Sequence, residues 1–394
     1  MNNVKVVFFN IPAYGHTNPT LQVVSELVSR RHDVRYYSYD MMKKSIEMVG
    51  AQFVSCDQCD FQNQLSKDEI TRMGKDIVLS TNVLVNTTLA LDGMIFADMK
   101  EYHPDCIVSD SMALWGKLIA LKLNIPYICS TTTFAFNQYS SKMLKYTFKE
   151  MISLMFSTRK ANKILKKLVD KGYPIDNILS IISNDNHTDT IVYTSKMFQP
   201  YSDTFSDKYE FVGPLIRKLD YQVERSKQKT IYISLGTVNN QFLSFYNHCI
   251  EAFENTNYDV IISIGNYLNI EDLKPFSNHI KVERFVNQME VLQCCDVFIT
   301  HCGMNSVNEA LYYGVPLVLF PQTPEQNVVA KRVEELEAGI YLKNNSVIEI
   351  KNAVEKILNQ SKYQTNAICI SQDFHQCLGA KQAADKIEQK AMEG

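Results

Sequence analysis

Short apolar runs alternate with longer amphipathic stretches along this chain of 394 residues. Runs of this kind, nearly continuous in Val, Ile, Phe and Tyr, are typical of strands buried in a parallel sheet. The stretches between them, such as 113–123, have apolar residues at helical spacing, and Asn18 with Pro19 predicts a helix that begins there and ends near Arg30. This alternation predicts an open parallel α/β sheet. The predicted strands of the first half are 4–9, 34–39, 52–56, 106–109, 126–129, 190–193 and 210–212.

The same alternation restarts after a polar stretch. Gly213-Pro214 and the following IRKLDYQVERSKQK are the best candidate for a linker. Strands are then predicted at 230–234, 259–264, 297–300 and 317–320, with helices over 242–255 and from about 306, where Ser306 and Glu309 have capping-box spacing. Two such arrays predict two Rossmann-like domains, 1–214 and 229–372, joined by the linker 215–228. The last stretch, 373–394, is predicted to be one helix.

Residues 130–185 interrupt the pattern. They are rich in Phe, Tyr, Met and Lys, contain no clear strand, and carry nine Lys or Arg between 142 and 171. We interpret this segment as a helix pair that flanks a binding pocket, with its basic side chains in solvent. Contact of the basic face with an anionic membrane surface is the alternative.

Composition narrows the class of protein. The hydrophobic fraction of 45%, the charged fraction of 21% and the net charge of −3 indicate a globular protein without an electrostatic reason to bind nucleic acid. No run of about 18 apolar residues appears, so no membrane span is expected. The ten cysteines have no disulfide-like spacing, and the chain begins directly with a strand-like run. Reduced thiols and a cytoplasmic location are therefore expected.

Two polar residues follow predicted strands of the first half. His16 follows the first strand and lies near a helix N-terminus, a position that disfavours the imidazolium and keeps the ring able to accept a proton. Asp110 follows another strand at the same edge of the sheet, so it is placed to meet His16. A carboxylate on one ring nitrogen would fix the tautomer, as a general base requires. Without further context, a single loop histidine is more often an ordinary polar contact.

The second half contains two places where a phosphate would be stabilised. The run Ser234-Leu235-Gly236-Thr237 ends a strand, and its glycine permits close backbone approach. The turn His301-Cys302-Gly303 lies between a strand and a helix, where free backbone N–H groups and the positive end of the helix dipole meet. A plain strand-to-helix turn is the alternative for the first of these.

The stretch 285–326 resembles the nucleotide-sugar-binding signature of the UDP-dependent glycosyltransferases, in the branch of the bacterial macrolide enzymes. Ala13–Pro19 and the SLGT run also fit, so the resemblance covers the whole chain. The matching residues of the stretch are Gln288, His301, Cys302, Gly303, Asn305, Ser306, Glu309, Gly314, Val315, Pro316, Pro321, Glu325 and Gln326.

The resemblance implies an inverting glycosyltransferase with the GT-B fold, in which two facing Rossmann-like domains enclose a cleft. The N-terminal domain would bind the acceptor, the C-terminal domain the nucleotide sugar, and the last helix would pack back on the N-terminal domain. His16 would act as the general base and Asp110 as its partner. The donor would be a UDP-sugar, most simply UDP-glucose, with a dTDP-sugar as the alternative.

The resemblance also assigns donor contacts. Glu309 would hold the ribose hydroxyls, although as a capping-box residue it would only close a helix start. Phe285 replaces the Trp and Asn287 the Pro that many relatives carry; a Phe still stacks on uracil, with less area. Glu325 and Gln326 would contact the donor sugar, and an exposed helix residue is the alternative for Gln326. The full donor set is Ser234, Gly236, Thr237, Phe285, Val286, Gln288, His301, Gly303, Asn305, Ser306, Glu309, Glu325 and Gln326.

The acceptor is a small hydrophobic molecule with a hydroxyl, of a kind that includes macrolides, flavonoids, sterols and lipids. Its pocket is assigned to aromatic and apolar residues that would serve equally well as core. No metal or other cofactor is expected, because the chain contains neither Asp-x-Asp nor His-Glu-x-x-His. A UDP-sugar epimerase and a non-catalytic nucleotide-sugar-binding partner protein are the competing functions. The candidate pocket residues are Trp115, Phe134, Phe136, Tyr139 and Met143.

Overall fold

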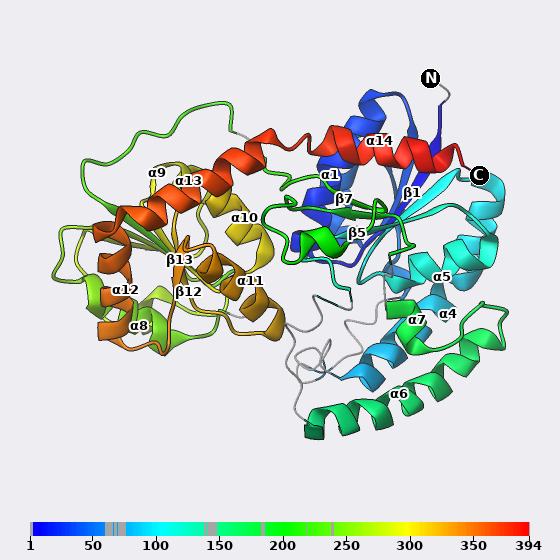
Figure 1. The fold of residues 1–394 in the computed structure, drawn as a ribbon, viewed down its shortest axis with the longest axis horizontal. Helices are drawn as coiled ribbons and strands as arrows, with labels where there is room; N and C mark the ends of the chain where they lie inside the picture. The colour runs from blue at the N-terminus through cyan, green and yellow to red at the C-terminus, as the bar shows by residue number, and fades with distance from the viewer. Residues whose placement is uncertain are drawn as a thin grey trace. The chain divides into compact units, whose positions relative to one another are not determined.

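The computed structural model describes residues 3–59, 66, 69, 76–137, 139, 148–182, 186–217, 219–237 and 240–393, without the side chains of 59 and 148–155. The chain folds as two compact units (Figure 1). Unit 1 comprises Met1–Tyr193, Tyr201–Leu215 and Leu378–Gly394; unit 2 comprises Thr194–Pro200 and Ile216–Cys377. Each contains one parallel sheet, so the predicted pair of parallel α/β domains is confirmed. The division of labour between them, acceptor in one and nucleotide sugar in the other, stays a prediction.

Unit 1 is built on a sheet of seven strands in the order β3-β2-β1-β4-β5-β6-β7. Every neighbouring pair is parallel, as the continuous apolar runs predict. The strands are β1 (Lys5–Phe9), β2 (Asp33–Ser38), β3 (Gln52–Ser55), β4 (Cys106–Asp110), β5 (Tyr127–Thr131), β6 (Thr190–Val192) and β7 (Tyr209–Phe211).

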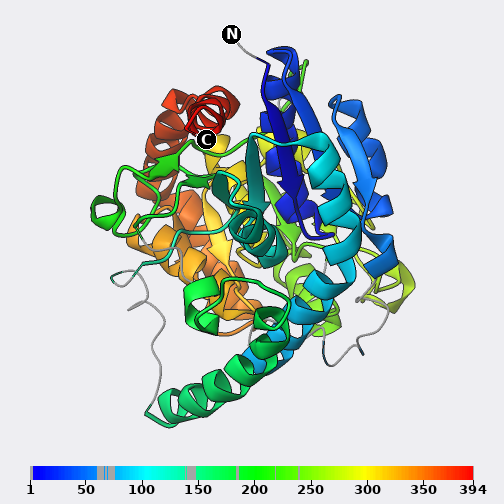
Figure 2. The same cartoon turned by 90° about the vertical axis from the view of Figure 1, so that its right-hand side faces the viewer.

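Alternate residues of β1 face two different cores. Val6 and Phe8 pack on one side with α1 and α14, and Val7 and Phe9 pack on the other with α4, α5, α6 and α7. Both faces are covered by helices, which is why the strand has almost no polar residue. In Figure 2 the long helix α6 runs alongside α4, against which it packs. The helices of unit 1 are α1 (Tyr14–Ser29), α2 (Lys43–Met48), α4 (Ile77–Tyr102), α5 (Leu114–Leu123), α6 (Phe148–Val169), α7 (Ile178–Ile182) and α14 (Ala380–Ala391).

Helix α4 is the one described helix that is long and apolar enough to cross a membrane, judged by length and composition only. Leu84, Leu91, Ile95 and Met99 of this helix are buried in the core of unit 1. The core helix of a globular domain can meet the same criteria, and 33% of the apolar window of α4 is buried inside the unit. The expectation of no membrane span stays a prediction.

The C-terminal stretch is two helices rather than the single helix predicted over 373–394. Helix α13 (Ser361–Gln376) ends in unit 2, and α14 begins only after Gly379, whose φ of +63° lies in the left-handed region that favours glycine. The backbone N–H of Gly379 donates to the carbonyl of Val212 at 3.0 Å, which holds the start of α14 on unit 1. A left-handed residue stops α-helical hydrogen bonding, so the break at 377–379 lets the chain change units.

Ion pairs fix α14 to unit 1, beside α1 (Figure 1). The carboxylate of Asp189, nearly buried, lies 2.8 Å from the ammonium of Lys386 and 2.9 Å from that of Lys390. Glu388 accepts from the ring of His32 at 2.7 Å and from the guanidinium of Arg30 at 3.1 Å. With Ala383, Ala384 and Ile387 in the same core as Val23 and Leu27, these contacts make the last helix a structural part of the first unit.

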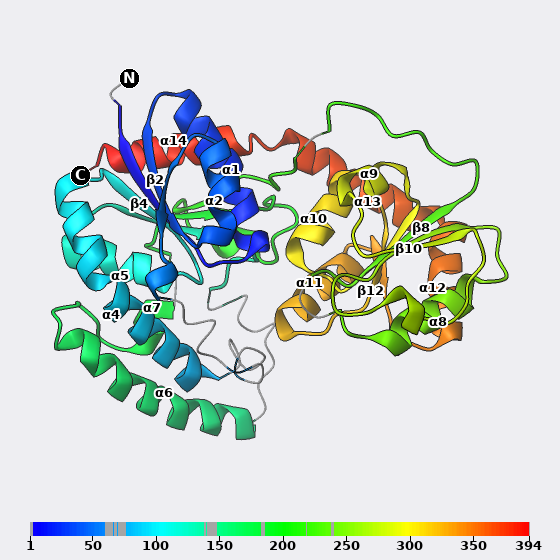
Figure 3. The same cartoon turned by 180° about the vertical axis from the view of Figure 1, so that it is seen from behind.

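Unit 2 has a sheet of six parallel strands in the order β10-β9-β8-β11-β12-β13, visible at the right of Figure 3. Its strands are β8 (Thr230–Ser234), β9 (Asp259–Ser263), β10 (Ile280–Glu283), β11 (Val297–Thr300), β12 (Leu317–Leu319) and β13 (Gly339–Tyr341). Its helices are α8 (Leu243–Phe253), α9 (Gln288–Cys294), α10 (Met304–Tyr312), α11 (Pro324–Glu335), α12 (Val347–Asn359) and α13. Described residues between 216 and 229 form neither helix nor strand and fall within this unit.

Candidate functional site

The two units place their candidate residues at equivalent points of their sheets. In unit 1 the strand order reverses between β1 and β4, and in unit 2 it reverses between β8 and β11. The crevice at the carboxyl ends of such a strand pair is where open α/β sheets bind ligands. His16 follows β1 and Asp110 ends β4, whereas Ser234 ends β8 and His301 follows β11. Each unit therefore presents its candidate residues at its own switch point.

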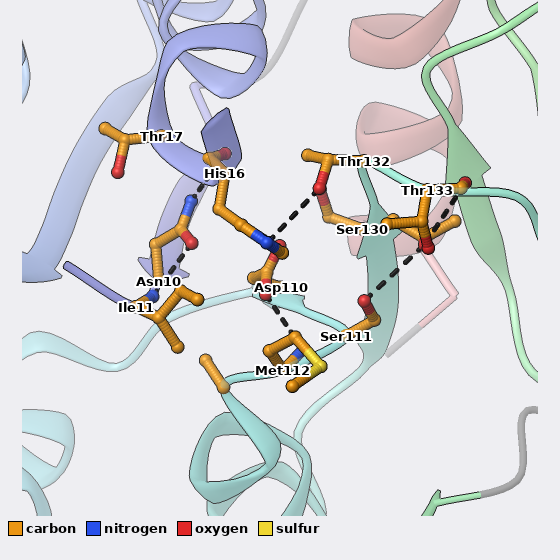
Figure 4. A network of polar contacts seen from close by, with 12 residues as sticks. Asn10, Ile11, His16, Thr17, Asp110, Ser111, Met112, Ser130, Thr132 and Thr133 are labelled. Carbon is orange, nitrogen blue, oxygen red and sulfur yellow. Dashed lines mark hydrogen bonds and ion pairs between the residues drawn. The ribbon is translucent and has the colours of Figure 1, made fainter. Parts of the chain in front are cut away.

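The structure brings His16 and Asp110 together. The Nδ1 atom of His16 lies 2.9 Å from Oδ2 of Asp110, whose side chain is fully buried, while the imidazole is 21% exposed. The other carboxylate oxygen, Oδ1, accepts a hydrogen bond from the backbone N–H of Met112 at 2.8 Å. Both carboxylate oxygens are thus held, and the carboxylate has a single orientation relative to the imidazole ring (Figure 4).

Thr132 is a second contact of the same ring nitrogen. Its hydroxyl lies 3.2 Å from Nδ1 of His16, on the loop after β5 (Figure 4). A nitrogen shared between a carboxylate and a hydroxyl carries its hydrogen toward the stronger acceptor, which is the carboxylate. The arrangement favours the tautomer with the proton on Nδ1, so that Nε2 is the basic nitrogen.

Helix α1 begins earlier than the sequence predicts. Its first residue is Tyr14, with Ala13 as the N-cap, so Asn18 is not a cap and Pro19 lies inside the helix. The backbone N–H groups of His16 and Thr17 both donate to the carbonyl of Ala13. Since His16 lies in the first turn, its side chain still lies near the positive end of the helix dipole.

Asn10 completes the support of this turn. Its Nδ2 donates to the backbone carbonyl of His16 at 3.0 Å and to the hydroxyl of Tyr36 at 3.0 Å, and its Oδ1 accepts from the N–H of Ile11. One buried amide therefore ties the end of β1 to the first turn of α1, which positions the backbone of His16. A polar residue directly after a buried strand was the only signal in the sequence for Asn10; Thr132 had none.

In unit 2 two glycines enclose the ring of His301. A Cβ atom placed on Gly236 would lie 2.6 Å from Cε1 of His301, and one on Gly303 would lie 2.6 Å from its Nε2. Gly236 also has a φ of +77°. Because real Cβ atoms do not approach so closely, a side chain at either position would force the His301 ring to move. The SLGT run and the HCG turn therefore pack against each other through this ring.

The surroundings of His301 keep it neutral. Burial lowers the pKa of His301 to about 4, against an opposing effect from the backbone of Ser234. Its Nδ1 is buried and has no hydrogen-bond partner among the residues the structure describes. Helix α10 begins directly after Gly303 with no side-chain cap and no acidic residue in its first turn. Its first N–H groups and the imidazole together suit an anion.

Gln288 on α9 and Glu309 on α10 form a partly buried polar pair. The amide nitrogen of Gln288 donates to the carboxylate of Glu309, and the same nitrogen lies 3.4 Å from the hydroxyl of Ser306. Burial raises the pKa of Glu309 to about 7, although the bond from Gln288 opposes the shift. The predicted capping box of Ser306 and Glu309 is wrong, because α10 begins at Met304 and Glu309 is bound to Gln288 instead.

A capping box does occur at α11. Thr323 is the N-cap, its hydroxyl accepts from the N–H of Gln326, and the side-chain oxygen of Gln326 accepts from the N–H groups of Thr323 and Gln322. The side-chain oxygen of Gln326, which was assigned to the donor sugar, is therefore already bound to backbone N–H groups at the start of α11. The side chain of Gln322, which the sequence did not single out, has both polar atoms buried without a partner among described residues.

The other predicted donor residues lie around these groups. Phe285 is 56% exposed on the loop before α9, so its ring face is available for stacking. Thr237 and Glu325 are exposed, and Val286 and Asn305 are half-buried.

The predicted acceptor pocket divides into core and surface. Trp115 is 6% exposed and belongs to the core of unit 1, and Phe134 is 3% exposed. Phe136 is half-buried and Tyr139 is exposed. Met143 lies outside the described residues. Of the basic segment, α6 buries Ala161, Leu165 and Leu168 in the core, and its Lys160, Lys163 and Lys167 are exposed.

The described cysteines form no disulfide, and no three His, Cys, Asp or Glu side chains within the described ranges gather as metal ligands would. Neither finding decides the redox compartment or the need for a metal, which stay predictions.

Comparison with known proteins identifies similar chains. Residues 248–381 match the family model described as erythromycin biosynthesis protein CIII-like, C-terminal domain. The chain is 32% identical over 393 residues to the uncharacterized UDP-glucosyltransferase YdhE of Bacillus subtilis (strain 168), covering 98% of both chains. It is 31% identical over 401 residues to the NDP-glycosyltransferase YjiC of Bacillus licheniformis, again covering 98% of both. The solved structure of the glycosyltransferase of kitacinnamycin superposes with a TM-score of 0.84 at 22% identity, covering 99% of both chains.

Proposed function

This chain belongs to the UDP-glycosyltransferases, in the macrolide-glycosyltransferase-like branch with the GT-B fold, and from that premise we propose that it transfers glucose from UDP-glucose to a hydroxyl of a small hydrophobic acceptor. As a transferase of natural-product type it uses a nucleotide-sugar donor and an acceptor. The observation that carries the proposed mechanism is the 2.9 Å contact between Nδ1 of His16 and the buried carboxylate of Asp110.

His16 is the proposed general base. With its Nδ1 hydrogen directed at Asp110, Nε2 accepts the proton of the acceptor hydroxyl as the oxygen attacks the anomeric carbon. The carboxylate stabilises the imidazolium that forms and holds the ring in one orientation. The C–O bond to the diphosphate breaks as the new bond forms on the opposite face, so the configuration of the anomeric carbon inverts.

The diphosphate is assigned to the second switch point. Neutral His301 would donate a hydrogen bond to a phosphate oxygen, and the open N-terminus of α10 would supply backbone N–H groups and a positive dipole. These donors stabilise the charge that develops on the leaving diphosphate. Gln288 and Glu309 are assigned to the ribose hydroxyls, and Phe285 to the face of the base.

No metal is required in this proposal, because N–H donors and a helix dipole take the place of a divalent cation at the diphosphate. A dTDP-sugar is the alternative donor. A macrolide or flavonoid is the proposed class of acceptor, and the cytoplasm is the proposed location.

The test compares the unmodified protein with His16→Ala and a matched control, His103→Asn. His103 is an exposed histidine of unit 1 with a left-handed φ of +52°, a conformation that Asn adopts readily. Transfer from UDP-glucose and dTDP-glucose to a panel of macrolide and flavonoid acceptors is measured with EDTA present. UDP-glucose binding is measured separately by calorimetry.

We expect His16→Ala to lose a factor of about 10²–10⁴ in kcat/KM with UDP-glucose affinity nearly unchanged, and His103→Asn to match the unmodified protein. Undiminished transfer by His16→Ala would reject the assigned base. UDP-glucose binding with no transfer to any acceptor would favour a non-catalytic binding protein, and conversion of UDP-glucose to another UDP-hexose without acceptor would favour an epimerase.

A further inference from the structure

The hydroxyl of Tyr232 lies among the proposed donor residues without having been assigned a role. Tyr232 is in β8, is 1% exposed, and its ring stacks on Phe298 of β11 with centroids 4.6 Å apart and planes 14° apart. The ring is thus part of the packing between the two strands at the switch point. Its hydroxyl, at the far end of the ring, reaches α9.

A chain of hydrogen bonds begins at this hydroxyl. Its oxygen lies 3.0 Å from Oε1 of Gln288 on α9, and Nε2 of Gln288 donates to the carboxylate of Glu309 on α10. Three elements that are separate in sequence are therefore joined through one amide. The amide has one donor end and one acceptor end, so its orientation decides which group it offers to Glu309.

The chain has two possible directions. If the phenol donates to Oε1, the NH₂ group faces Glu309 and matches an ionised carboxylate. If the amide is reversed, its oxygen faces Glu309, which must then be protonated to donate. The structure has the first direction, because the phenol donates to Oε1 of Gln288 and Nε2 of Gln288 donates to Glu309. Burial raises the pKa of Tyr232, so the phenol keeps the hydrogen that this direction requires.

We propose that the hydroxyl of Tyr232 is a positioning group for the nucleotide ribose, because it orients the Gln288 amide so that its NH₂ group meets the ionised carboxylate of Glu309. This inference rests on the proposed assignment of Gln288 and Glu309 to the ribose. The hydroxyl does not touch the ribose; it sets the direction of the hydrogen-bond chain that does.

Few other groups near this chain titrate near neutral pH. Burial raises the pKa of Cys295, which lies near Tyr232, and lowers the pKa of His301 at the neighbouring turn to about 4. Between pH 6 and 8.5 the thiol, the phenol and the imidazole all stay neutral, and Glu309 is the group that changes charge. The pH dependence of donor binding is therefore a readout of this carboxylate.

The test is the affinity of UDP-glucose for Tyr232→Phe, measured by calorimetry between pH 6 and 8.5. UDP-glucose has no phosphate group that titrates in this range, unlike UDP. Removing one oxygen keeps the ring stack. We expect the Kd at pH 8 to rise about three- to tenfold, the size of one buried hydrogen bond, and the pH midpoint of binding to move up by about half a unit, because the ionised carboxylate loses its oriented donor.

Tyr363→Phe is the matched control. Tyr363 is a 5% exposed tyrosine in a core of unit 2, on α13, which carries none of the proposed donor residues. Loss of its hydroxyl should leave both the Kd and the midpoint unchanged. Thermal melting of both variants separates a folding defect from a binding defect.

A double-mutant cycle tests whether the effect passes through the amide. In a Gln288→Ala background, Tyr232→Phe should cause less than about a twofold further change, because no amide is left to orient. The same loss in both backgrounds, or an unshifted midpoint, would overturn the inference while leaving the proposed function intact. Absence of UDP-glucose binding to the unmodified protein would overturn both together.

Discussion

The switch point of unit 1 and the switch point of unit 2 occupy the same place in their sheets and differ in charge. In unit 1 a partly exposed imidazole faces a fully buried carboxylate. The Met112 N–H holds the carboxylate, and the Thr132 hydroxyl contacts the imidazole. In unit 2 an imidazole is enclosed by two glycines, and burial keeps it neutral. One site thus contains an imidazole beside a carboxylate, and the other a neutral imidazole beside two glycines.

The difference shows how one topology serves two kinds of chemistry. Proton transfer needs a carboxylate next to the base, so that the charge formed on the ring is balanced. Binding of a diphosphate needs N–H groups without a competing carboxylate, and close backbone approach, which glycines permit. The residues directly after the strands decide which of the two a crevice suits, while the sheet itself is the same.

The largest effect is expected from Asp110→Asn, which changes the charge of unit 1 with little change in shape. The Met112 N–H requires an oxygen at Oδ1, so the new NH₂ group would face Nδ1 of His16. That nitrogen would then have to accept, which places the ring hydrogen on Nε2 and blocks the base. We expect kcat/KM to fall by about 10²–10⁴ with unchanged UDP-glucose affinity. A loss smaller than tenfold would contradict the proposed role of the Asp110 carboxylate as the partner of His16.

The next effect concerns the glycines of unit 2. In Gly236→Ala the new Cβ would lie 2.6 Å from the His301 ring, at a φ of +77° that strains any other residue. We expect the Kd for UDP-glucose to rise at least about tenfold, measured by calorimetry. Gly93→Ala is the control, because Gly93 is in helix α4 with nothing within 4 Å of the added atom. It should leave binding unchanged and slightly raise the melting temperature, since Ala favours a helix. If both variants bind UDP-glucose with equal affinity, donor binding does not depend on the close packing of Gly236 against His301.

A smaller effect is expected from pH. Glu309 has its pKa raised to about 7 by burial, so its carboxylate is protonated below that value and ionised above it. An ionised carboxylate accepts from both ribose hydroxyls, so UDP-glucose affinity should increase several-fold from pH 6 to pH 8. Glu309→Gln should bind more weakly and without this dependence. A pH profile of the unmodified protein that is flat across this range would contradict the ribose assignment.

The smallest effect is expected from Phe285, the residue proposed to stack on the nucleotide base. Phe285 is exposed and stands where related sequences carry Trp. Phe285→Trp adds stacking area, so the Kd for UDP-glucose should fall about two- to fivefold, with kcat little changed. Measuring UDP-glucose and dTDP-glucose in parallel shows whether the ring face distinguishes the two bases. Weaker binding of both would show that the base does not stack on this residue.

The sequence was sufficient for the family signature and for every strand except β10 and β13, which were not predicted. The apolar runs that form the sheets are long and continuous, since a strand covered by helices on both faces has little place for polar residues. The start of α1, the break at 377–379 and the cap of α10 were predicted wrongly. At the last two a residue remote in sequence contacts the misjudged segment: Val212 accepts from Gly379, and Gln288 donates to Glu309. At α1 the contact is closer along the chain, since Asn10 holds the carbonyl of His16 in the first turn.

By itself the sequence determined two parallel α/β units and which residues follow the strands at each switch point. Periodicity and local turn chemistry are properties of neighbouring residues, so both can be read along the chain. Only the tertiary structure decided that His16 meets Asp110 across 94 positions, that two glycines enclose His301, and that Tyr232 reaches Gln288. Such contacts depend on strand order and on the distances between side-chain atoms, and neither is encoded in the spacing of residues along a chain.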